Sequence, residues 1–144
     1  MPYSELMIRP MREELTSAGV QELRTAQDVD AFLAEKSGTA MLVVNSVCGC
    51  AAGMARPGIR HALAHGKRPD RVGTVFAGQD LEATARARSY FQDIPPSSPS
   101  IAFLKDGELV YFMPRHRIEG RNAEAVAGDL MAVFEEHCAV TAAS

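Results

Sequence analysis

The sequence predicts an α/β fold in which helices cover both faces of a mixed central β-sheet. Short apolar runs alternate with amphipathic segments of helical period, a pattern typical of parallel βαβ units. The last two apolar runs, 101–104 and 109–112, flank Lys-Asp-Gly-Glu, which is a strong signal for an antiparallel hairpin. Parallel units followed by a hairpin and a closing helix indicate a three-layer sandwich.

The chain has 144 residues, 47% of them apolar and 23% charged, with a formal net charge of −3. This length suits one domain, 1–144, with its own core. Because no basic excess is available to neutralise phosphates, we expect no nucleic acid and no membrane as partner. No run reaches the roughly 18–20 apolar residues that span a bilayer, and the N-terminus lacks the blocks of a signal peptide. We therefore expect a cytoplasmic protein.

The first two elements expected are a helix and a short strand. Residues 10–18 predict a short helix, with Pro10 in its first turn and Gly19 just past its end. Residues 20–24 follow as a short edge strand.

The next helix and strand lead to the centre of the sheet. Thr25 and Asp28 resemble a capping box and open a helix that Gly38 closes. Residues 40–46 (Ala-Met-Leu-Val-Val-Asn-Ser) read as a strand that is buried on both faces.

The second half continues the alternation. Residues 51–65 suit a helix with Pro57 as a kink, 72–77 a buried strand, and 81–91 a helix. Residues 94–99 carry three prolines and cannot be helical.

The hairpin and a last helix complete the chain. Asp106-Gly107 suits a type I′ turn, which needs positive φ at both central residues, and 122–137 is amphipathic. The resulting order of elements is the thioredoxin arrangement with an extra N-terminal helix.

Residues 47–50 read Val-Cys-Gly-Cys and lie where the buried strand 40–46 gives way to a helix. A thiol at a helix N-terminus ionises readily, and the thiolate is the form that reacts. In a reducing compartment a close pair of cysteines indicates redox chemistry or metal binding rather than a structural disulfide. Cys48 is the candidate attacking thiol and Cys50 its partner.

The spacing of the two cysteines also carries information. Cys-Gly-Cys closes a shorter disulfide ring than Cys-x-x-Cys, so we expect more strain and a more oxidising couple. Gly49 allows the backbone to turn tightly there. In a thioredoxin-like domain a proline in cis lies opposite the reactive cysteine, and Pro99, just before strand 101–104, is the matching residue. We predict that the Ser98–Pro99 bond is cis.

The chain resembles the bacilliredoxin family of thioredoxin-like proteins. The similarity rests on Ser-Val-Cys-Gly-Cys-Ala-Ala-Gly-x-Ala-Arg-Pro at 46–57 with Asn45 before it, on the prolines and serines at 96–100, and on Arg-His-x-Ile-Glu-Gly-Arg at 115–121. It extends to Pro10-Met11-Arg12 and covers nearly the whole chain.

The resemblance implies removal of bacillithiol, a low-molecular-weight thiol, from mixed disulfides on S-thiolated cytosolic client proteins, with weak disulfide isomerase activity. It implies that Cys48 takes the thiol from the client and that Cys50 then closes a disulfide and releases it. No separate cofactor is expected, because bacillithiol is itself the substrate or co-reductant.

Other residues are weaker candidates for a functional role. Arg115 and His116 follow the second hairpin strand and are candidates for lowering the Cys48 pKa or for binding a carboxylate of the small thiol. Met54 and Pro57 indicate helix packing and a kink, with Arg56 as a further functional candidate. Cys138 is expected to be structural or merely exposed.

Different classes of function remain open at this stage. The same cysteines could belong to a zinc or iron–sulfur module, but this needs further ligands to converge on them, including across a homodimer. His61 and His65 have metal-site spacing without a third ligand, so we expect surface histidines and no metal. A third alternative is a redox sensor whose oxidation only changes a protein interface.

Overall fold

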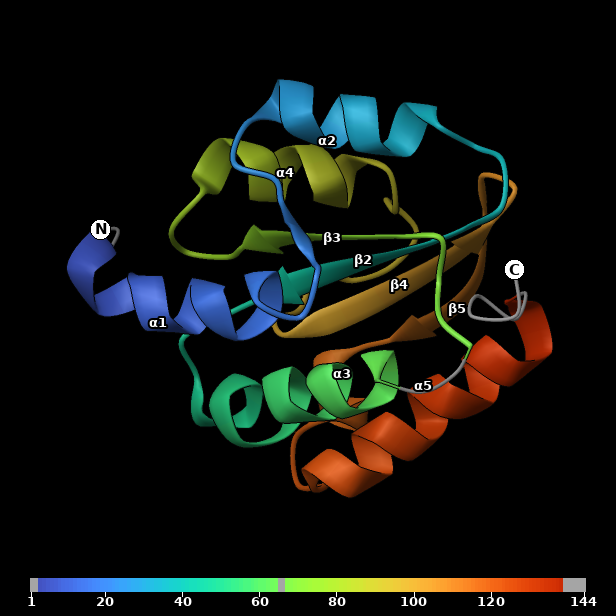
Figure 1. The fold of residues 1–144 in the computed structure, drawn as a ribbon. Coiled ribbons are helices and arrows are strands. Elements are labelled where there is room, and N and C mark those ends of the chain that lie inside the picture. The colour runs from blue at the N-terminus through green and yellow to red at the C-terminus, as the bar shows by residue number, and fades with distance from the viewer. Residues whose placement is uncertain (1–2, 65–66, 139–144) are drawn as a thin grey trace.

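The computed structural model describes residues 3–64 and 67–138, which form an α/β architecture around a five-stranded mixed sheet (Figure 1). Its elements are α1 (Glu5–Thr16), β1 (Gln21–Glu22), α2 (Ala26–Ala34), β2 (Thr39–Asn45), η1 (Ala51–Ala55), α3 (Arg56–Leu63), β3 (Arg71–Phe76), α4 (Leu81–Ser89), β4 (Ser100–Lys105), β5 (Glu108–Met113), η2 (Arg115–Arg117) and α5 (Ala123–His137). The predicted α/β class and order of elements are confirmed.

The strands lie in the order β1-β3-β2-β4-β5. β1, β3 and β2 are parallel to one another, whereas β4 runs antiparallel to β2 and to β5. β2 is therefore central, and all seven of its residues are buried, as its apolar composition predicts. The carboxyl end of β2 is the point from which the cysteine segment leaves the sheet.

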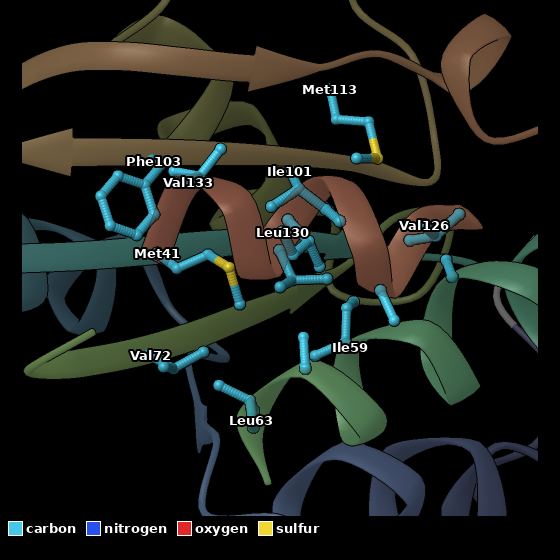
Figure 2. Close-up of a cluster of buried hydrophobic side chains, with 14 of the residues drawn as sticks. Met41, Ile59, Leu63, Val72, Ile101, Phe103, Met113, Val126, Leu130 and Val133 are labelled. Atoms are coloured by element: carbon cyan, nitrogen blue, oxygen red, sulfur yellow. The ribbon is translucent and has the colours of Figure 1, made fainter. Parts of the chain in front are cut away.

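Each face of the sheet has its own pair of helices. α3 packs with α5 on one face and α2 with α4 on the other, which makes the sheet the middle of three layers (Figure 1). Successive side chains of β2 alternate between the two cores: Met41 points to the α3/α5 side and Leu42 to the α2/α4 side. Figure 2 shows the first of these cores, in which Met41 and Phe103 of the sheet face Leu130 of α5.

The N-terminal helix is longer than predicted. α1 begins at Glu5, after an N-cap at Ser4, and Pro10 lies inside it rather than in its first turn. The prediction was wrong because it treated proline as a helix start. Proline removes only one backbone donor, and burial of Ile8 and Leu15 on one face of α1 holds the helix together on both sides of it.

Local capping and turn signals were more reliable. Thr25 accepts the backbone N–H of Asp28 at 3.0 Å, while the Asp28 carboxylate accepts the N–H of Arg24 instead of that of Thr25. Asp106 and Gly107 have φ of 52° and 85°, which confirms the predicted hairpin turn. Most strand and helix limits differ from the predicted ones by one or two residues.

Among residues 3–64 and 67–138, none of the helices has the length and apolar character that crossing a bilayer requires.

Candidate active site

Cys48 occupies the junction between the central strand and a helix. β2 ends at Asn45, and helical backbone begins at Gly49. The N–H groups of Ala51 and Ala52 donate to the carbonyl oxygen of Cys48 at 3.0 and 3.1 Å, which starts the helix at the cysteine itself. Cys48 is half-buried and a free thiol, so its sulfur sits at the positive end of a helix and remains accessible.

The helix that follows is not uniform. Its first segment, η1, is π-helical, and regular α-helix starts only at Arg56, next to Pro57. The single kinked helix predicted over 51–65 is therefore two segments, and α3 ends at Leu63; residue 65 lies outside the described residues. π-helical turns are rare in proteins overall, and those that occur are often found at functional sites.

The two thiols have opposite tendencies to ionise. Burial is the largest influence on Cys48 and opposes its ionisation, but hydrogen bonds from the Cys50 thiol, the Ser46 hydroxyl and two backbone N–H groups outweigh it and lower its pKa. Burial, followed by the hydrogen bond to Cys48 and the charge on that sulfur, raises the pKa of Cys50. The arrangement favours ionisation of Cys48 over ionisation of Cys50.

Pro99 lies beside this turn. β2 and β4 pair with Val44 opposite Ser100, so Pro99 comes next to the end of β2 at Asn45. The Ser98–Pro99 bond is cis, as predicted, and Pro99 is buried. Its role towards a substrate stays a prediction.

Arg115 reaches the site from η2, but His116 does not. The backbone N–H of Arg115 donates to the Ser97 hydroxyl at 3.2 Å, and its guanidinium lies 3.4 Å from the Ser98 carbonyl oxygen. The positive charge of Arg115 lowers the pKa of Cys50 and so opposes the increase that burial causes. His116 is exposed, and the described part of the chain shows no contact between it and either cysteine.

A buried arginine supports the turn from inside, which sequence reasoning underestimated. The guanidinium of Arg56 is 2% exposed and donates to the Asn45 side-chain oxygen at 2.9 Å and to the Ser46 carbonyl at 2.6 Å. It also pairs with Glu14 of α1 at 2.8 Å. The available signal was an asparagine at the end of a buried strand followed, eleven residues on, by an arginine in a helix (Asn45 and Arg56).

The remaining candidate residues lie elsewhere. Cys138 is buried near Thr39, at the opposite end of β2 from the cysteine pair, and burial raises its pKa. It is a core residue, which matches the structural alternative of the prediction and not the exposed one. His61 is exposed on α3, and His65 lies outside the described residues. Within 3–64 and 67–138, no three His, Cys, Asp or Glu side chains gather as a metal site would need.

Comparisons with known proteins identify relatives of this chain. A family model described as disulphide isomerase matches residues 3–138. A bacilliredoxin of Koribacter versatilis is 55% identical over 97% of this chain and 97% of its own, and one of Salinibacter ruber is 56% identical over 96% of this chain and 82% of its own. A bacilliredoxin of Cytophaga hutchinsonii is 54% identical over 93% and 98%.

Solved structures support the fold. A thioredoxin of Fasciola hepatica superposes with a TM-score of 0.56 at 19% identity, over 82% of this chain and 99% of its own. Thioredoxin O2 of Arabidopsis thaliana, in its oxidised state, gives 0.56 at 12% identity, over 82% and 96%. The fold is therefore thioredoxin-like, and the chain belongs to the bacilliredoxin family of thiol–disulfide oxidoreductases.

Proposed function

We propose that this protein removes bacillithiol, or a similar low-molecular-weight thiol, from mixed disulfides on cytosolic proteins. The Cys48 thiolate attacks the sulfur of the small thiol. A disulfide forms between Cys48 and that thiol, the client–thiol bond breaks, and the client sulfur leaves as a thiolate. Cys50 then loses its proton and attacks Cys48, which closes the Cys48–Cys50 disulfide and releases the small thiol as a thiolate.

One observation carries this proposal: hydrogen bonding lowers the pKa of Cys48, while the neighbouring Cys50 has a raised pKa. An attacking sulfur needs to be ionised before substrate arrives, whereas a resolving sulfur is better kept protonated until a mixed disulfide has formed. When Cys48 enters a mixed disulfide, it loses the negative charge that disfavours ionisation of Cys50. The first step therefore prepares the second.

The small thiol is the part of the substrate with an identifiable recognition group. Arg115 is 42% exposed on its side chain and carries an ion pair to Glu119 at 3.2 Å, so a carboxylate of the thiol can replace Glu119 at little cost. We assign Arg115 to that contact. His116, the next residue, is exposed and stays a weaker candidate for the same carboxylate. A reduced thiol or a protein reductant returns the pair to its starting state.

The test traps the intermediate. Cys50→Ala, incubated with a bacillithiolated protein, is expected to gain one bacillithiol on Cys48 by intact-protein and peptide mass spectrometry. Cys48→Ala is expected to release none, and Cys138→Ala, altered at the far end of β2, is expected to release it as the unchanged protein does. Full release by Cys48→Ala contradicts the mechanism. A parallel assay on the same client carrying glutathione separates thiol exchange in general from selectivity for bacillithiol.

A weak disulfide isomerase activity is a second function that the family description favours. The attacking sulfur can enter a client disulfide and leave again when the client's own thiol attacks Cys48. This reaction uses Cys48 but not Cys50, so reactivation of a scrambled disulfide protein is expected to survive Cys50→Ala and to be lost in Cys48→Ala.

A further inference from the structure

A serine hydroxyl lies against the reactive cysteine. Ser46 is 7% exposed and sits between the last residue of β2 and the cysteine pair. Its oxygen accepts the backbone N–H of Cys48 at 3.0 Å, and this hydrogen bond holds the hydroxyl next to Cys48. Because the oxygen already accepts a hydrogen bond, its own hydrogen remains available for donation. A hydrogen bond between this hydroxyl and the Cys48 sulfur is one of the causes that lower the Cys48 pKa.

The position of this hydroxyl is set by buried neighbours. The backbone N–H of Ser46 donates to the Asn45 side-chain oxygen at 2.8 Å, and Arg56 donates to both that oxygen and the Ser46 carbonyl. The same nitrogen of the Arg56 guanidinium thus holds the Ser46 carbonyl directly and the Ser46 N–H through the Asn45 side chain. Glu14 of α1 holds the other side of the guanidinium, so the N-terminal helix belongs to this support.

We propose that Ser46 is a third catalytic group, which donates a hydrogen bond to the Cys48 thiolate, and that Arg56 is the positioning residue that holds it there. The proton stays on the Ser46 oxygen throughout, while bonds are made and broken at sulfur. The proposal rests on Cys48 being the attacking thiol of the proposed function. It does not depend on which small thiol is removed.

A hydrogen bond of this kind affects rate in two opposed ways. It increases the fraction of Cys48 that is ionised, and it makes the thiolate a somewhat weaker nucleophile. Removing the donor therefore slows reaction at pH values below the Cys48 pKa and accelerates it at high pH, where every molecule is ionised. A variant that merely damages the site loses rate at both ends. The other charged or titrating groups around the pair, Cys50, Arg115 and the Arg56–Glu14 pair, are unchanged by a serine substitution.

The test is the pH profile of Cys48 alkylation by iodoacetamide in the full chain, followed peptide by peptide by mass spectrometry. In Ser46→Ala the midpoint is expected to rise by about one pH unit, since a hydrogen bond to a charged group is among the stronger ones. With thiol nucleophilicity following basicity, the rate is expected to fall about threefold at low pH and to rise about threefold on the alkaline plateau. Ser46→Thr, which keeps the hydroxyl, is expected to restore the midpoint.

Matched controls separate positioning from damage. Thr74→Val removes another buried hydroxyl, whose bond is to the Val43 carbonyl, and is expected to leave the profile unchanged. Arg56→Met is expected to raise the midpoint as Ser46→Ala does. Arg60→Met is its control, because Arg60 also joins α3 to α1, through the Glu14 carbonyl and Ser17, without touching the turn.

The outcomes are distinct. An unchanged midpoint in Ser46→Ala, or a loss of plateau rate without a shift, overturns the role of Ser46. A high midpoint in the unchanged protein contradicts the proposed function itself, because Cys48 is then not the ionised thiol. If Ser46→Ala does not fold, Arg56→Lys decides the question, since one ammonium cannot replace the forked contacts and the midpoint is still expected to rise.

Discussion

At the scale of single residues, the site depends on a difference between two identical side chains. Cys48 and Cys50 are one residue apart, yet the pKa of the first is lowered and that of the second is raised. The difference comes from position: Cys48 lies at the start of the helical turn and accepts hydrogen bonds, whereas Cys50 is 7% exposed and faces the core. In the proposed mechanism, this difference separates the attacking thiol from the resolving thiol.

Arg115 is expected to act on the second step. Its charge lowers the pKa of Cys50, so Arg115→Ala is expected to raise that pKa further and to slow closure of the Cys48–Cys50 disulfide by about threefold at neutral pH, a modest effect because the side chain is exposed. Stopped-flow measurement of small-thiol release after a fast first attack checks this. Arg117→Ala is the control, since that exposed arginine faces Asp129 instead. If both variants slow disulfide closure equally, Arg115 has no specific role in the second step.

At the scale of elements, α3 follows the cysteine turn and packs closely against α5, and this contact supports the turn. A Cβ placed on Gly58 would lie 2.8 Å from a Val126 methyl carbon and 3.0 Å from the Ala123 carbonyl oxygen. Gly58→Ala is therefore expected to destabilise the protein by about 1–2 kcal/mol, because overpacking outweighs the gain in helix propensity. Urea unfolding followed by circular dichroism measures this.

Gly128 offers a matched control on α5. Apart from its chain neighbours and the backbone of its own helix, no atom of the described residues lies within 4 Å of the Cβ that Gly128 would gain, and Gly128 is exposed. Gly128→Ala is expected to stabilise the protein by about 0.5–1 kcal/mol through helix propensity alone. Stabilisation by Gly58→Ala as well as by Gly128→Ala would show that α3 and α5 are not in such close contact.

The elements also show which features sequence reasoning can reach. The Thr25 cap, the Asp106-Gly107 turn and the buried central strand follow from local chemistry and were predicted. The start of α1 and the role of Arg56 depend on contacts between residues far apart in the chain. An arginine at 56 is unremarkable in a helical pattern, and only the fold brings Glu14 and Asn45 to it. The π-helical turn likewise has no local signal.

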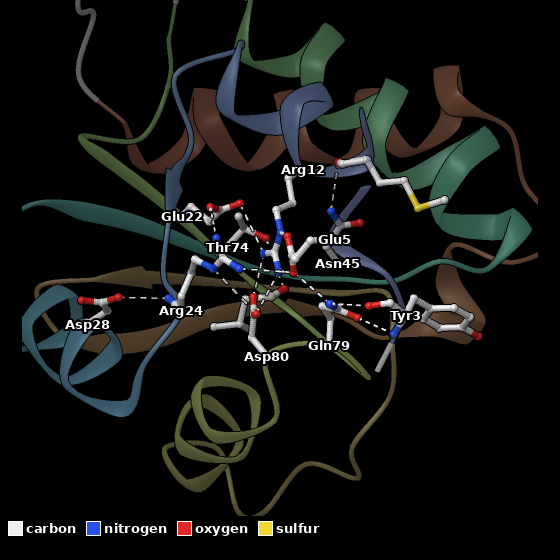
Figure 3. Close-up of polar contacts among 12 residues, drawn as sticks. Tyr3, Glu5, Arg12, Glu22, Arg24, Asp28, Asn45, Thr74, Gln79 and Asp80 are labelled. Carbon is white, nitrogen blue, oxygen red and sulfur yellow. Dashed lines mark hydrogen bonds and ion pairs between the residues drawn. The ribbon is translucent and has the colours of Figure 1, made fainter. Parts of the chain in front are cut away.

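At the scale of the whole molecule, a charged cluster fastens α1 to the parallel edge of the sheet. Arg12 is buried and bonds to Glu5 and Asp80, with Glu22 of β1 close by (Figure 3). The Arg12 guanidinium also lies over the ring of Phe76. Because Asn45 also donates to the Met11 carbonyl at 3.4 Å, the same helix contacts both this cluster and the cysteine turn. Loosening the cluster is expected to affect stability before it affects chemistry.

The pH dependence of stability tests that cluster. Hydrogen bonds from Arg12 and Gln79 lower the pKa of Glu5 to about 2, so its contribution is complete above the unfolded pKa of about 4.3 and is lost as pH falls towards 2. Glu5→Gln is expected to be slightly less stable than the unchanged protein at pH 6, by less than about 1 kcal/mol because Glu5 is partly exposed. Thermal unfolding at pH 6 and at pH 2 is expected to show that most of this difference is lost at pH 2. A difference that persists there in full contradicts the assignment.

The claim on which the account depends most is that Cys48 ionises more readily than Cys50 or Cys138. Site-resolved alkylation of the fully reduced, unchanged protein measures this directly. The account predicts that Cys48 reacts first, with a midpoint below the ordinary cysteine value of about 8.5, while Cys50 and Cys138 react only at higher pH. Reaction of Cys50 before Cys48, or a common midpoint for both, would contradict it.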